Sequence, residues 1–236
     1  MSKLNVKIFA DGADFEGMLQ AAKNPLIQGL TTNPTLMRKA GITDYEEFSK
    51  KVLSHIKILP ISLEVFADDH NEMRRQALKI GSWGANVYVK IPVTNSEGTP
   101  SYELIRELTQ NGIKLNVTAL LTLEQVSYVT QALKGGAPSI VSIFAGRIAD
   151  TGKDPLPMMR AALAMCQAAG PQIELLWASP REFLNIMQAD EMGCHIITVT
   201  ADILSKISLL NKDLNLFSLE TVRMFKNDAE KAGYRL

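Results

Sequence analysis

The 236-residue chain has only two cysteines, three histidines and no net charge. Cys166 and Cys194 lie far apart, outside any CxxC pair and among apolar neighbours, so we expect two buried thiols rather than a disulfide or a metal site. His55, His70 and His195 are isolated from one another and no HExxH occurs. A histidine-based metal site is therefore not expected.

Charge of one sign and long apolar runs are also missing. With 25 basic and 25 acidic residues, the chain gives no electrostatic reason to expect nucleic acid or an anionic membrane as a partner. No apolar stretch approaches the ~18 residues of a membrane span. Residues 1–4 lead into a strand pattern without the features of a signal peptide, so the cytoplasm is the expected compartment.

What the sequence does have is a regular alternation of short β-branched runs with longer segments of helical periodicity. The predicted strands are Val6–Ala10, Ile27–Leu30, Ile61–Phe66, Asn86–Ile91, Lys114–Thr118, Ser139–Ile143, Ile173–Ala178 and His195–Thr200. Amphipathic segments such as 102–110 and 123–133 are typical of crossover helices. Glycines that fit the left-handed residue after a helix precede several strands, at Gly84, Gly112, Gly135, Gly136, Gly170 and Gly193.

Eight strands spaced about 30 residues apart predict an α/β fold, a single-domain (β/α)8 TIM barrel over residues 1–236. A terminal amphipathic helix is expected at about 214–236, where apolar residues recur at helical spacing. The competing architecture is an open doubly wound sheet, but its GxGxxG loop is absent, as is a GxxxxGK[ST] loop. In a barrel, active sites form at the carboxyl ends of the strands, so polar residues there are informative.

Lys90 stands alone in the apolar run 86–93. Burial at the end of a strand favours the neutral amine, which is a nucleophile toward carbonyl groups. On this run alone, a lysine that reaches solvent or pairs with a carboxylate is the commoner interpretation. Other strand ends supply Asp11, Glu64, small hydroxyl residues and two arginines, a set that fits a carbonyl nucleophile, proton shuttles and a phosphate clamp.

Simpler interpretations exist for single members of this set. Asp11 fits a turn, Asn33-Pro34 the start of a helix, and Ser179-Pro180 an N-cap followed by its favoured proline. The acidic pair 68–69 is interpreted as the cap of the following helix rather than as a metal site.

Seven segments along nearly the whole chain together resemble the transaldolase family of class I, Schiff-base-forming enzymes, including the related fructose 6-phosphate aldolases. The segments are Phe9-Ala10-Asp11, Gly29-Leu30-Thr31-Thr32-Asn33-Pro34-Thr35, Ser62-Leu63-Glu64-Val65, Val89-Lys90-Ile91-Pro92-Val93-Thr94, Gly112-Ile113-Lys114-Leu115-Asn116-Val117-Thr118, Phe144-Ala145-Gly146-Arg147-Ile148 and Ala178-Ser179-Pro180-Arg181. Their order and rough spacing are those of the family.

The resemblance implies that Lys90 forms the imine, that Asp11 is the general acid/base, and that Glu64 and Thr118 hold a catalytic water. Substrate-binding residues implied in the same way are Thr32, Asn33, Asn116, Ser142, Phe144, Arg147, Ser179 and Arg181. Of these, the two arginines and Ser179 would receive a phosphate group. No metal or organic cofactor is expected, because a protonated imine is itself the electron sink.

In the family that this chain resembles, two positions separate transaldolases from simple aldolases. The aldolases have a Gln at one of these positions and a Tyr at the other. Glu64 and Phe144 are the transaldolase choice, because a phenyl ring cannot donate a proton to the enamine. The expected partners are sugar phosphates and further copies of the chain. An aldolase that releases dihydroxyacetone, and an inactive barrel that binds sugar phosphates, stay open as alternatives.

Three segments depart from the family pattern. The stretch 94–101 is longer than the usual turn after the lysine, Trp177 stands where a small residue is common, and residues 198–200 replace a more apolar strand end. We expect all three to border the acceptor site.

Overall fold

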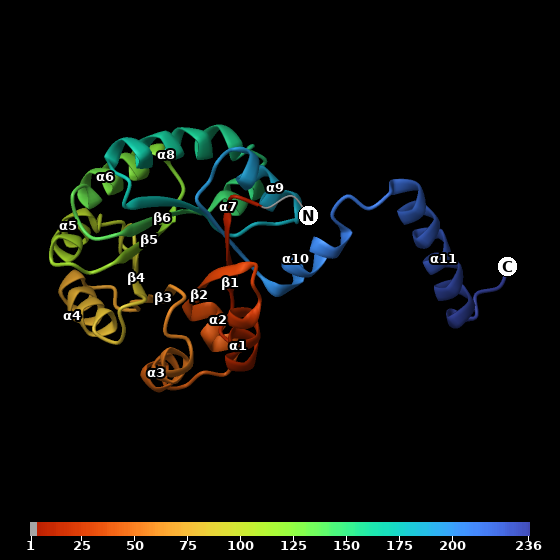
Figure 1. Ribbon diagram of the computed structural model, residues 1–236, viewed down its shortest axis with the longest axis horizontal. Coiled ribbons are helices and arrows are strands. Elements are labelled where there is room, and N and C mark those ends of the chain that lie inside the picture. The colour runs from red at the N-terminus through yellow and green to blue at the C-terminus, as the bar shows by residue number, and fades with distance from the viewer. Residues whose placement is uncertain (1–3) are drawn as a thin grey trace.

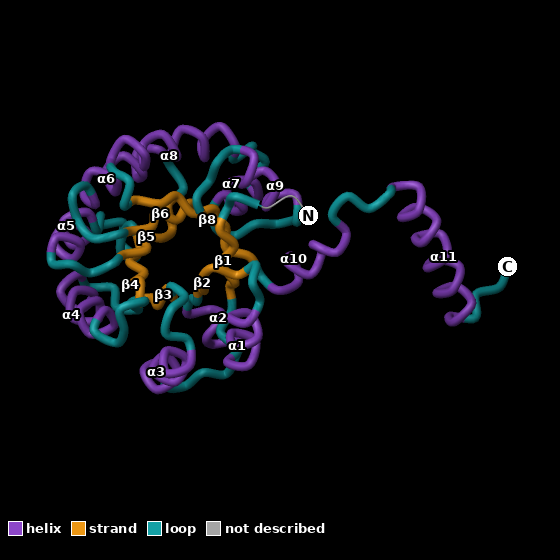
Figure 2. Tube along the Cα trace, viewed as in Figure 1, coloured by secondary structure: helices purple, strands orange, loops and turns teal. Residues whose placement is uncertain are grey.

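A computed structural model describes residues 4–236, which contain eight parallel strands closed into a barrel in sequence order (Figure 2). Each strand pairs with the next, and β8 pairs with β1. The strands are β1 (Lys7–Asp11), β2 (Ile27–Thr31), β3 (Ile61–Glu64), β4 (Val87–Pro92), β5 (Leu115–Leu120), β6 (Ser139–Ile143), β7 (Ile173–Trp177) and β8 (Ile196–Val199).

Helices form the outer layer around this barrel, and the last one projects away from it (Figure 1). They are α1 (Phe15–Lys23), α2 (Pro34–Lys39), α3 (Tyr45–His55), α4 (His70–Gly81), α5 (Tyr102–Gln110), α6 (Leu123–Leu133), α7 (Ala145–Asp150), α8 (Leu156–Ala169), α9 (Leu184–Glu191), α10 (Ala201–Ser205), a 3₁₀ turn η1 (Lys206–Leu209) and α11 (Leu214–Ala232). The (β/α)8 TIM barrel with a C-terminal helix is confirmed.

The predicted strands are confirmed, with ends that shift by one or two residues. The segments predicted as crossover helices coincide with α5 and α6. Two glycine predictions are wrong. Gly84 has no positive φ because α4 already ends at Gly81, and Gly136 has none because Gly135 takes the left-handed position. A Cβ on Gly136 would instead lie 2.3 Å from the Thr109 hydroxyl, so close packing requires this glycine.

Apolar side chains form two layers, one inside the barrel and one between the strands and the helices. The reason is that alternate side chains of a strand point into the barrel and out toward the helices. The interior layer is small and comprises Phe9, Ile140, Leu176, Ala178 and Ile196. A Cβ on Gly29 of β2 would lie 2.5 Å from the Phe9 ring. Glycine at this strand position therefore makes room for the ring that fills the barrel beneath its open end.

Cys166 in α8 and Cys194 before β8 are both buried and free, as predicted. Burial raises the pKa of each thiol to about 12. Within residues 4–236, no group of three or more His, Cys, Asp or Glu side chains is placed to hold a metal ion. No helix in the same range is both long enough and apolar enough to cross a membrane.

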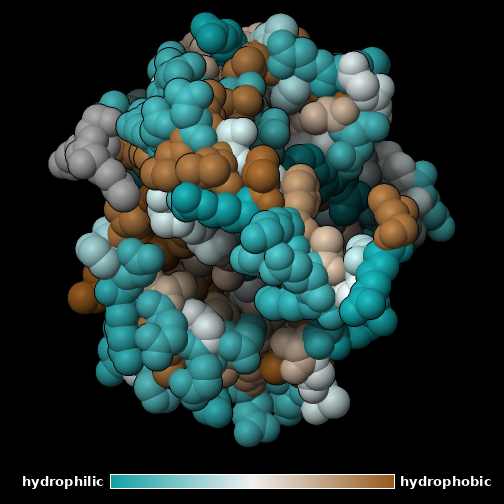
Figure 3. Space-filling model, turned by 90° about the vertical axis from the view of Figure 1, so that its right-hand side faces the viewer, coloured by the Kyte–Doolittle hydropathy of each residue, from teal (hydrophilic) through white to brown (hydrophobic). Residues whose placement is uncertain are grey.

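α11 is the predicted terminal helix, and it ends at a left-handed Gly233. None of its residues is buried. Apolar side chains along it are exposed, among them Leu216, Leu219, Val222 and Phe225. Figure 3 views the molecule from the side on which α11 lies and shows apolar groups at the surface among hydrophilic ones. The helix leaves its apolar side chains uncovered in a single copy of the chain.

Candidate active site

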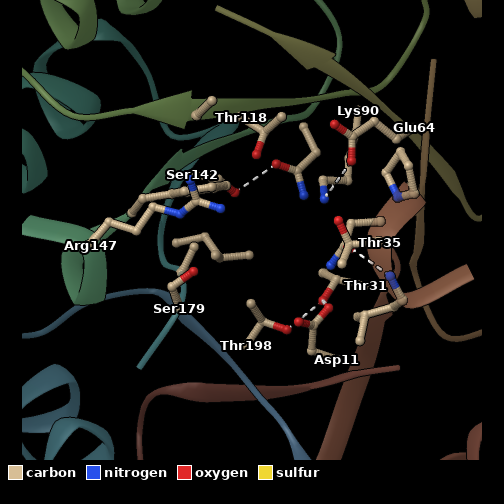
Figure 4. Close-up of a pocket in the computed structure, with 18 residues that line it drawn as sticks. Asp11, Thr31, Thr35, Glu64, Lys90, Thr118, Ser142, Arg147, Ser179 and Thr198 are labelled. Atoms are coloured by element: carbon tan, nitrogen blue, oxygen red, sulfur yellow. Dashed lines mark hydrogen bonds and ion pairs between the residues drawn. The ribbon is translucent and has the colours of Figure 1, made fainter. Parts of the chain in front are cut away.

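A cavity of about 450 Å³ opens at the carboxyl ends of the strands (Figure 4). Every predicted site residue lines it except Thr32 and Arg181. The lining comprises Asp11, Thr31, Asn33, Pro34, Thr35, Leu36, Glu64, Lys90, Asn116, Thr118, Ala119, Ser142, Phe144, Arg147, Leu176, Ala178, Ser179 and Thr198. These residues come from all eight strands or the loops that follow them, because the parallel barrel places every carboxyl end on one rim.

Lys90 lies inside this cavity with its side chain only 9% exposed. Its Nζ donates a 2.8 Å hydrogen bond to the Thr32 carbonyl and lies 3.1 Å from Glu64 Oε2. The Tyr45 hydroxyl donates to the Glu64 carbonyl and fixes the end of β3 from the helix side. Burial raises the pKa of Tyr45, so it stays a neutral donor. The lysine is thus buried, charge-compensated and directed at the cavity.

Asp11 lies across the cavity at the end of β1 (Figure 4). Its Oδ1 accepts a 2.7 Å hydrogen bond from the Thr31 hydroxyl, which lies 2.5 Å from the Thr198 hydroxyl. Burial raises the pKa of the Asp11 carboxyl, although the hydrogen bond from Thr31 and the charge of Lys90 act in the opposite direction. A carboxyl with a raised pKa, facing a lysine in a cavity, is suited to proton transfer.

A row of hydrogen-bonded polar side chains lies beside Lys90. Ser142 donates to Asn116 Oδ1 at 2.7 Å, and Asn116 Nδ2 donates to the Ser62 hydroxyl at 2.9 Å. The Thr118 hydroxyl is buried and has no hydrogen-bond partner among residues 4–236. A buried hydroxyl without a partner is costly, and Thr118 keeps this unused hydrogen-bonding capacity at the wall of the cavity.

Asn33 begins α2, and its side chain accepts from the Leu36 amide at 2.9 Å. The prediction of a helix start at Asn33 is therefore confirmed, and the residue also lines the cavity. Its Oδ1 is engaged by the helix, whereas its amide NH₂ group takes no part in the cap.

The opposite wall is formed where β6 and β7 end. Arg147 lies over the Phe144 ring, 5.0 Å from the ring centre. Ser179 has φ of 57°, and Ala119, near the end of β5, has φ of 65°. Residues other than glycine adopt this left-handed conformation only where the surroundings impose it, often at functional sites. The close approach of α7 to the Ser179 carbonyl requires Gly146, since a Cβ there would lie 1.5 Å from that oxygen.

Comparison with known proteins identifies the family of this chain. Residues 8–236 match the family described as Transaldolase/Fructose-6-phosphate aldolase. The chain belongs to this family. It is 34% identical over 202 residues to a protein named "Probable transaldolase" from Dehalococcoides mccartyi, with 86% of this chain and 90% of that one covered.

Another relative, from a Thermoanaerobacter species and also named "Probable transaldolase", is 32% identical over 231 residues, with 98% of this chain and 100% of the relative covered. A solved structure of an HpcH/HpaI aldolase/citrate lyase family protein from Burkholderia cenocepacia superposes with a TM-score of 0.56 at 14% identity, covering 93% of this chain and 95% of that one. This solved structure is similar to the chain in fold alone.

Two residues that the transaldolase-family resemblance assigns to substrate lie elsewhere. The Thr32 hydroxyl is buried and donates to the Ser62 carbonyl, so only the Thr32 backbone faces Lys90. Arg181 is held by Asp150, with its Nε and Nη2 at 2.9 and 2.5 Å from the carboxylate oxygens. This pair also lowers the pKa of Asp150. The ion pair with Asp150 at the surface thus turns the Arg181 guanidinium away from the cavity lining.

The segments that depart from the family pattern have mixed outcomes. Thr198 lines the cavity, as expected, but Trp177 and the stretch 94–101 do not. Trp177 points outward into the layer between strands and helices, because its neighbour Leu176 takes the inward position on β7. The stretch 94–101 is held by Asp68, which accepts from the backbone and hydroxyl of Ser96 at 2.7 Å.

Asp69 caps α4, which confirms the predicted cap for one member of the acidic pair, whereas Asp68 binds Ser96 instead. Asp69 accepts from the backbone amides of Asn71 and Glu72, so its carboxylate is occupied at the start of the helix.

Sequence reasoning assigned no role in this hydrogen-bond network to three of its members: Thr31, Thr198 and Ser62. Thr31 is the first threonine of the TTNP segment, and its position at the end of a predicted strand was a usable signal. Ser62 lies two residues before Glu64, so strand alternation places both on the inner face. Nothing in the local pattern pairs Thr198 with Thr31, because they are 167 residues apart.

Proposed function

We propose that this protein is a transaldolase that uses Lys90 to form a Schiff base with a ketose phosphate, such as fructose 6-phosphate or sedoheptulose 7-phosphate. It then transfers the three-carbon dihydroxyacetone unit to an aldose phosphate. The observation that carries the proposal is the buried Lys90 in a polar cavity within a chain of the transaldolase family. Among the described residues that line the cavity, Lys90 is the only lysine.

The chemistry starts when the Lys90 amine adds to the ketone carbon of the donor. The lysine gives a proton to Glu64, the carboxylate 3.1 Å away, and water leaves as the imine forms. We propose that Glu64 and the unpartnered Thr118 hydroxyl hold this water. A protonated imine withdraws electrons from the neighbouring carbon and needs no metal or organic cofactor for this purpose.

Cleavage of the carbon–carbon bond follows. Asp11 accepts the proton of the hydroxyl next to the breaking bond, the electron pair moves into the imine, and an aldose phosphate leaves. The enamine that remains on Lys90 then attacks the acceptor aldehyde, whose oxygen takes the proton back from Asp11. Hydrolysis of the new imine frees the product ketose and the lysine.

The substrate is held by the remaining groups of the cavity. Asn33 and Asn116 are placed to bind sugar hydroxyls, with Ser142 orienting the Asn116 amide. Arg147 and Ser179 are our choice for the phosphate, because both line the cavity and guanidinium groups match phosphate oxygens. Arg181 contributes to the phosphate site only when its pair with Asp150 opens.

Phe144 favours transfer over release of dihydroxyacetone. Its phenyl ring lines the cavity and lies under the Arg147 guanidinium. A phenyl ring has no proton to give, so the enamine persists until an acceptor aldehyde arrives. The second candidate is an aldolase that releases dihydroxyacetone, and a third is a barrel that binds sugar phosphates without turnover.

The deciding experiment is incubation of the protein with fructose 6-phosphate and borohydride, followed by mass spectrometry of the peptides. A reduced three-carbon adduct on Lys90 is expected. Dihydroxyacetone release is then measured with and without an aldose phosphate acceptor. Release that is fast without acceptor supports the aldolase, and a complete lack of adduct supports the non-catalytic barrel.

We also propose that the protein works as a homo-oligomer in which α11 of one copy covers another copy. The exposed apolar side chains of α11 need a partner surface, because uncovered apolar faces of this kind mark interaction sites. A largely apolar hollow of about 610 Å³ lies between α1 and α10 and is lined by Met18, Ala21, Leu30, Leu204 and Ile207.

The two unpaired thiols fit a reducing compartment, for which we propose the cytoplasm.

The proposed homo-oligomer is tested by light scattering on the wild type and on the double variant Leu219→Glu, Val222→Glu. The wild type is expected to be larger than a monomer and the variant to dissociate. A matched control is Thr221→Glu in the same helix. A wild type that is monomeric at micromolar concentration overturns the assembly without touching the proposed chemistry.

A further inference from the structure

Three neighbouring strands bring an uninterrupted chain of hydroxyl groups to Asp11. β1 lies between β2 and β8, and it carries Asp11, while these neighbours carry Thr31 and Thr198 (Figure 4). Thr31 donates to Asp11 at 2.7 Å, and the hydroxyls of Thr31 and Thr198 lie 2.5 Å apart. Thr198 is only 6% exposed, so this hydroxyl has little access to water.

The number of protons fixes the direction of these hydrogen bonds. An ionised carboxylate only accepts, and a threonine hydroxyl has a single proton to donate. While Asp11 is ionised, the proton of Thr31 points to the carboxylate, and the short contact to Thr198 requires Thr198 to donate to Thr31. A hydroxyl that accepts a hydrogen bond is a stronger donor in turn, and this effect is larger in a buried setting.

We propose that Thr198 is a positioning residue for Asp11: by donating to Thr31, it aims the Thr31 hydroxyl at the carboxylate and favours the ionised form. This inference rests on the proposed function for the use of Asp11 as the base that accepts the substrate proton. It explains why a strand end that otherwise faces an apolar barrel interior carries a buried hydroxyl.

Other charges near this carboxyl come from several elements. Lys90 on β4 favours its ionised form, and Glu64 on β3 disfavours it. Asp14, the N-cap of α1, lines a neighbouring hollow together with Asp11 and is occupied by the amide of Gly17. A substitution at position 198 removes none of these three charged groups, so such a variant isolates the hydroxyl.

The test compares Thr198→Val, which has nearly the same shape without the hydroxyl, with Thr198→Ser, which keeps it. The pH dependence of kcat/KM is measured with fructose 6-phosphate and an aldose phosphate. In Thr198→Val the acidic limb is expected to move to higher pH by about half a unit or more, because one hydrogen bond that supports the carboxylate is lost. Thr198→Ser restores the wild-type limb. Thr130→Val, which removes a buried hydroxyl bonded to the Val126 carbonyl on α6, serves as the control that leaves the limb in place.

A purely structural role predicts lower activity at every pH with no movement of the limb, and that result overturns the proposal. A second measurement does not depend on turnover. The carboxyl carbon of Asp11 is titrated by NMR in protein carrying ¹³C-labelled aspartate, with its signal assigned by its loss in Asp11→Asn. The same upward shift is expected in Thr198→Val, and in Thr198→Ala if the valine variant does not fold.

The two proposals fail in different ways. If the wild type forms no adduct with fructose 6-phosphate, the proposed function falls, yet the NMR titration still decides the role of Thr198. If the wild type is active and the Asp11 titration is the same in wild type and Thr198→Val, the inference about Thr198 falls alone.

Discussion

Glu64 and Lys90 are register partners on adjacent parallel strands, and their side chains meet as an ion pair of 3.1 Å at the rim of the barrel. Both are largely withdrawn from water, so each charge depends on the other. Asp11 adds a second negative charge to the same cavity, where one ammonium faces two carboxyl groups. Removal of the charge of Asp11 should therefore relieve this imbalance.

Lys90→Met removes the proposed nucleophile while keeping the length of the side chain. The borohydride-reduced adduct should disappear and kcat/KM should fall by about 10³-fold or more, because covalent catalysis has no substitute in this cavity. Lys114→Met is the control, since that lysine precedes β5 and donates to the Ala85 carbonyl outside the cavity. Near-normal turnover by the Lys90 variant contradicts the mechanism.

Arg147→Ala should impair phosphorylated substrates far more than unphosphorylated ones. Loss of a charge-assisted contact is expected to lower kcat/KM for fructose 6-phosphate by about 10- to 150-fold. Arg181→Ala should have a smaller effect of the same kind, because Asp150 holds that guanidinium in the resting protein. Arg106→Ala, in a surface pair with Glu103, is the control. Equal losses with fructose and fructose 6-phosphate would remove the phosphate assignment.

Phe144→Tyr places a phenol where the wild type has a phenyl ring on the cavity wall. Acceptor-independent release of dihydroxyacetone should rise, and the ratio of transfer to release should fall, because the phenol offers a proton to the enamine. Phe144→Leu, which removes the ring beneath Arg147 without adding a proton donor, is the control and should not raise the release. The proposal of a transaldolase does not survive if the unmodified protein already releases dihydroxyacetone rapidly without acceptor.

Asp11→Asn should stabilise the protein at neutral pH, although it removes the proposed base. Burial raises the pKa of Asp11 above its ordinary value of 3.8. An acid with a higher pKa in the folded state contributes stability below its unfolded pKa and loses it as the pH rises through the folded value. The melting temperature of Asp11→Asn should therefore exceed that of wild type at pH 7, and the difference should shrink toward pH 4. A difference that grows as the pH falls would reverse the sign of this argument.

Gly146→Ala tests the contact between α7 and the strained end of β7. The new Cβ would lie 1.5 Å from the Ser179 carbonyl oxygen, so the backbone at the phosphate wall must shift. We expect a loss of about 2–4 kcal/mol in the free energy of unfolding, measured by urea denaturation. Gly12→Ala, where a Cβ meets nothing within 4 Å, should change stability little. Similar stability of the two variants would show that the backbone at this wall of the cavity can shift without a large loss in the free energy of unfolding.

The sequence alone determined the barrel and most of its rim. Hydrophobic periodicity is a local property, so eight strands and their crossover helices could be predicted within one or two residues at their ends. Parallel closure then sends all strand ends to one side, which is why Asp11, Glu64 and Lys90 could be assigned to a common site before any distance was known.

Only the tertiary structure decided where individual side chains point and what they contact. Arg181 follows a strand end as predicted, yet Asp150, 31 residues away, turns its guanidinium toward the surface. Thr198 meets Thr31 because the barrel closes β8 onto β1, which brings together residues that share no local pattern. Such contacts depend on register between strands and on competition among neighbouring charges, and these are set when the chain closes on itself rather than by the residues on either side.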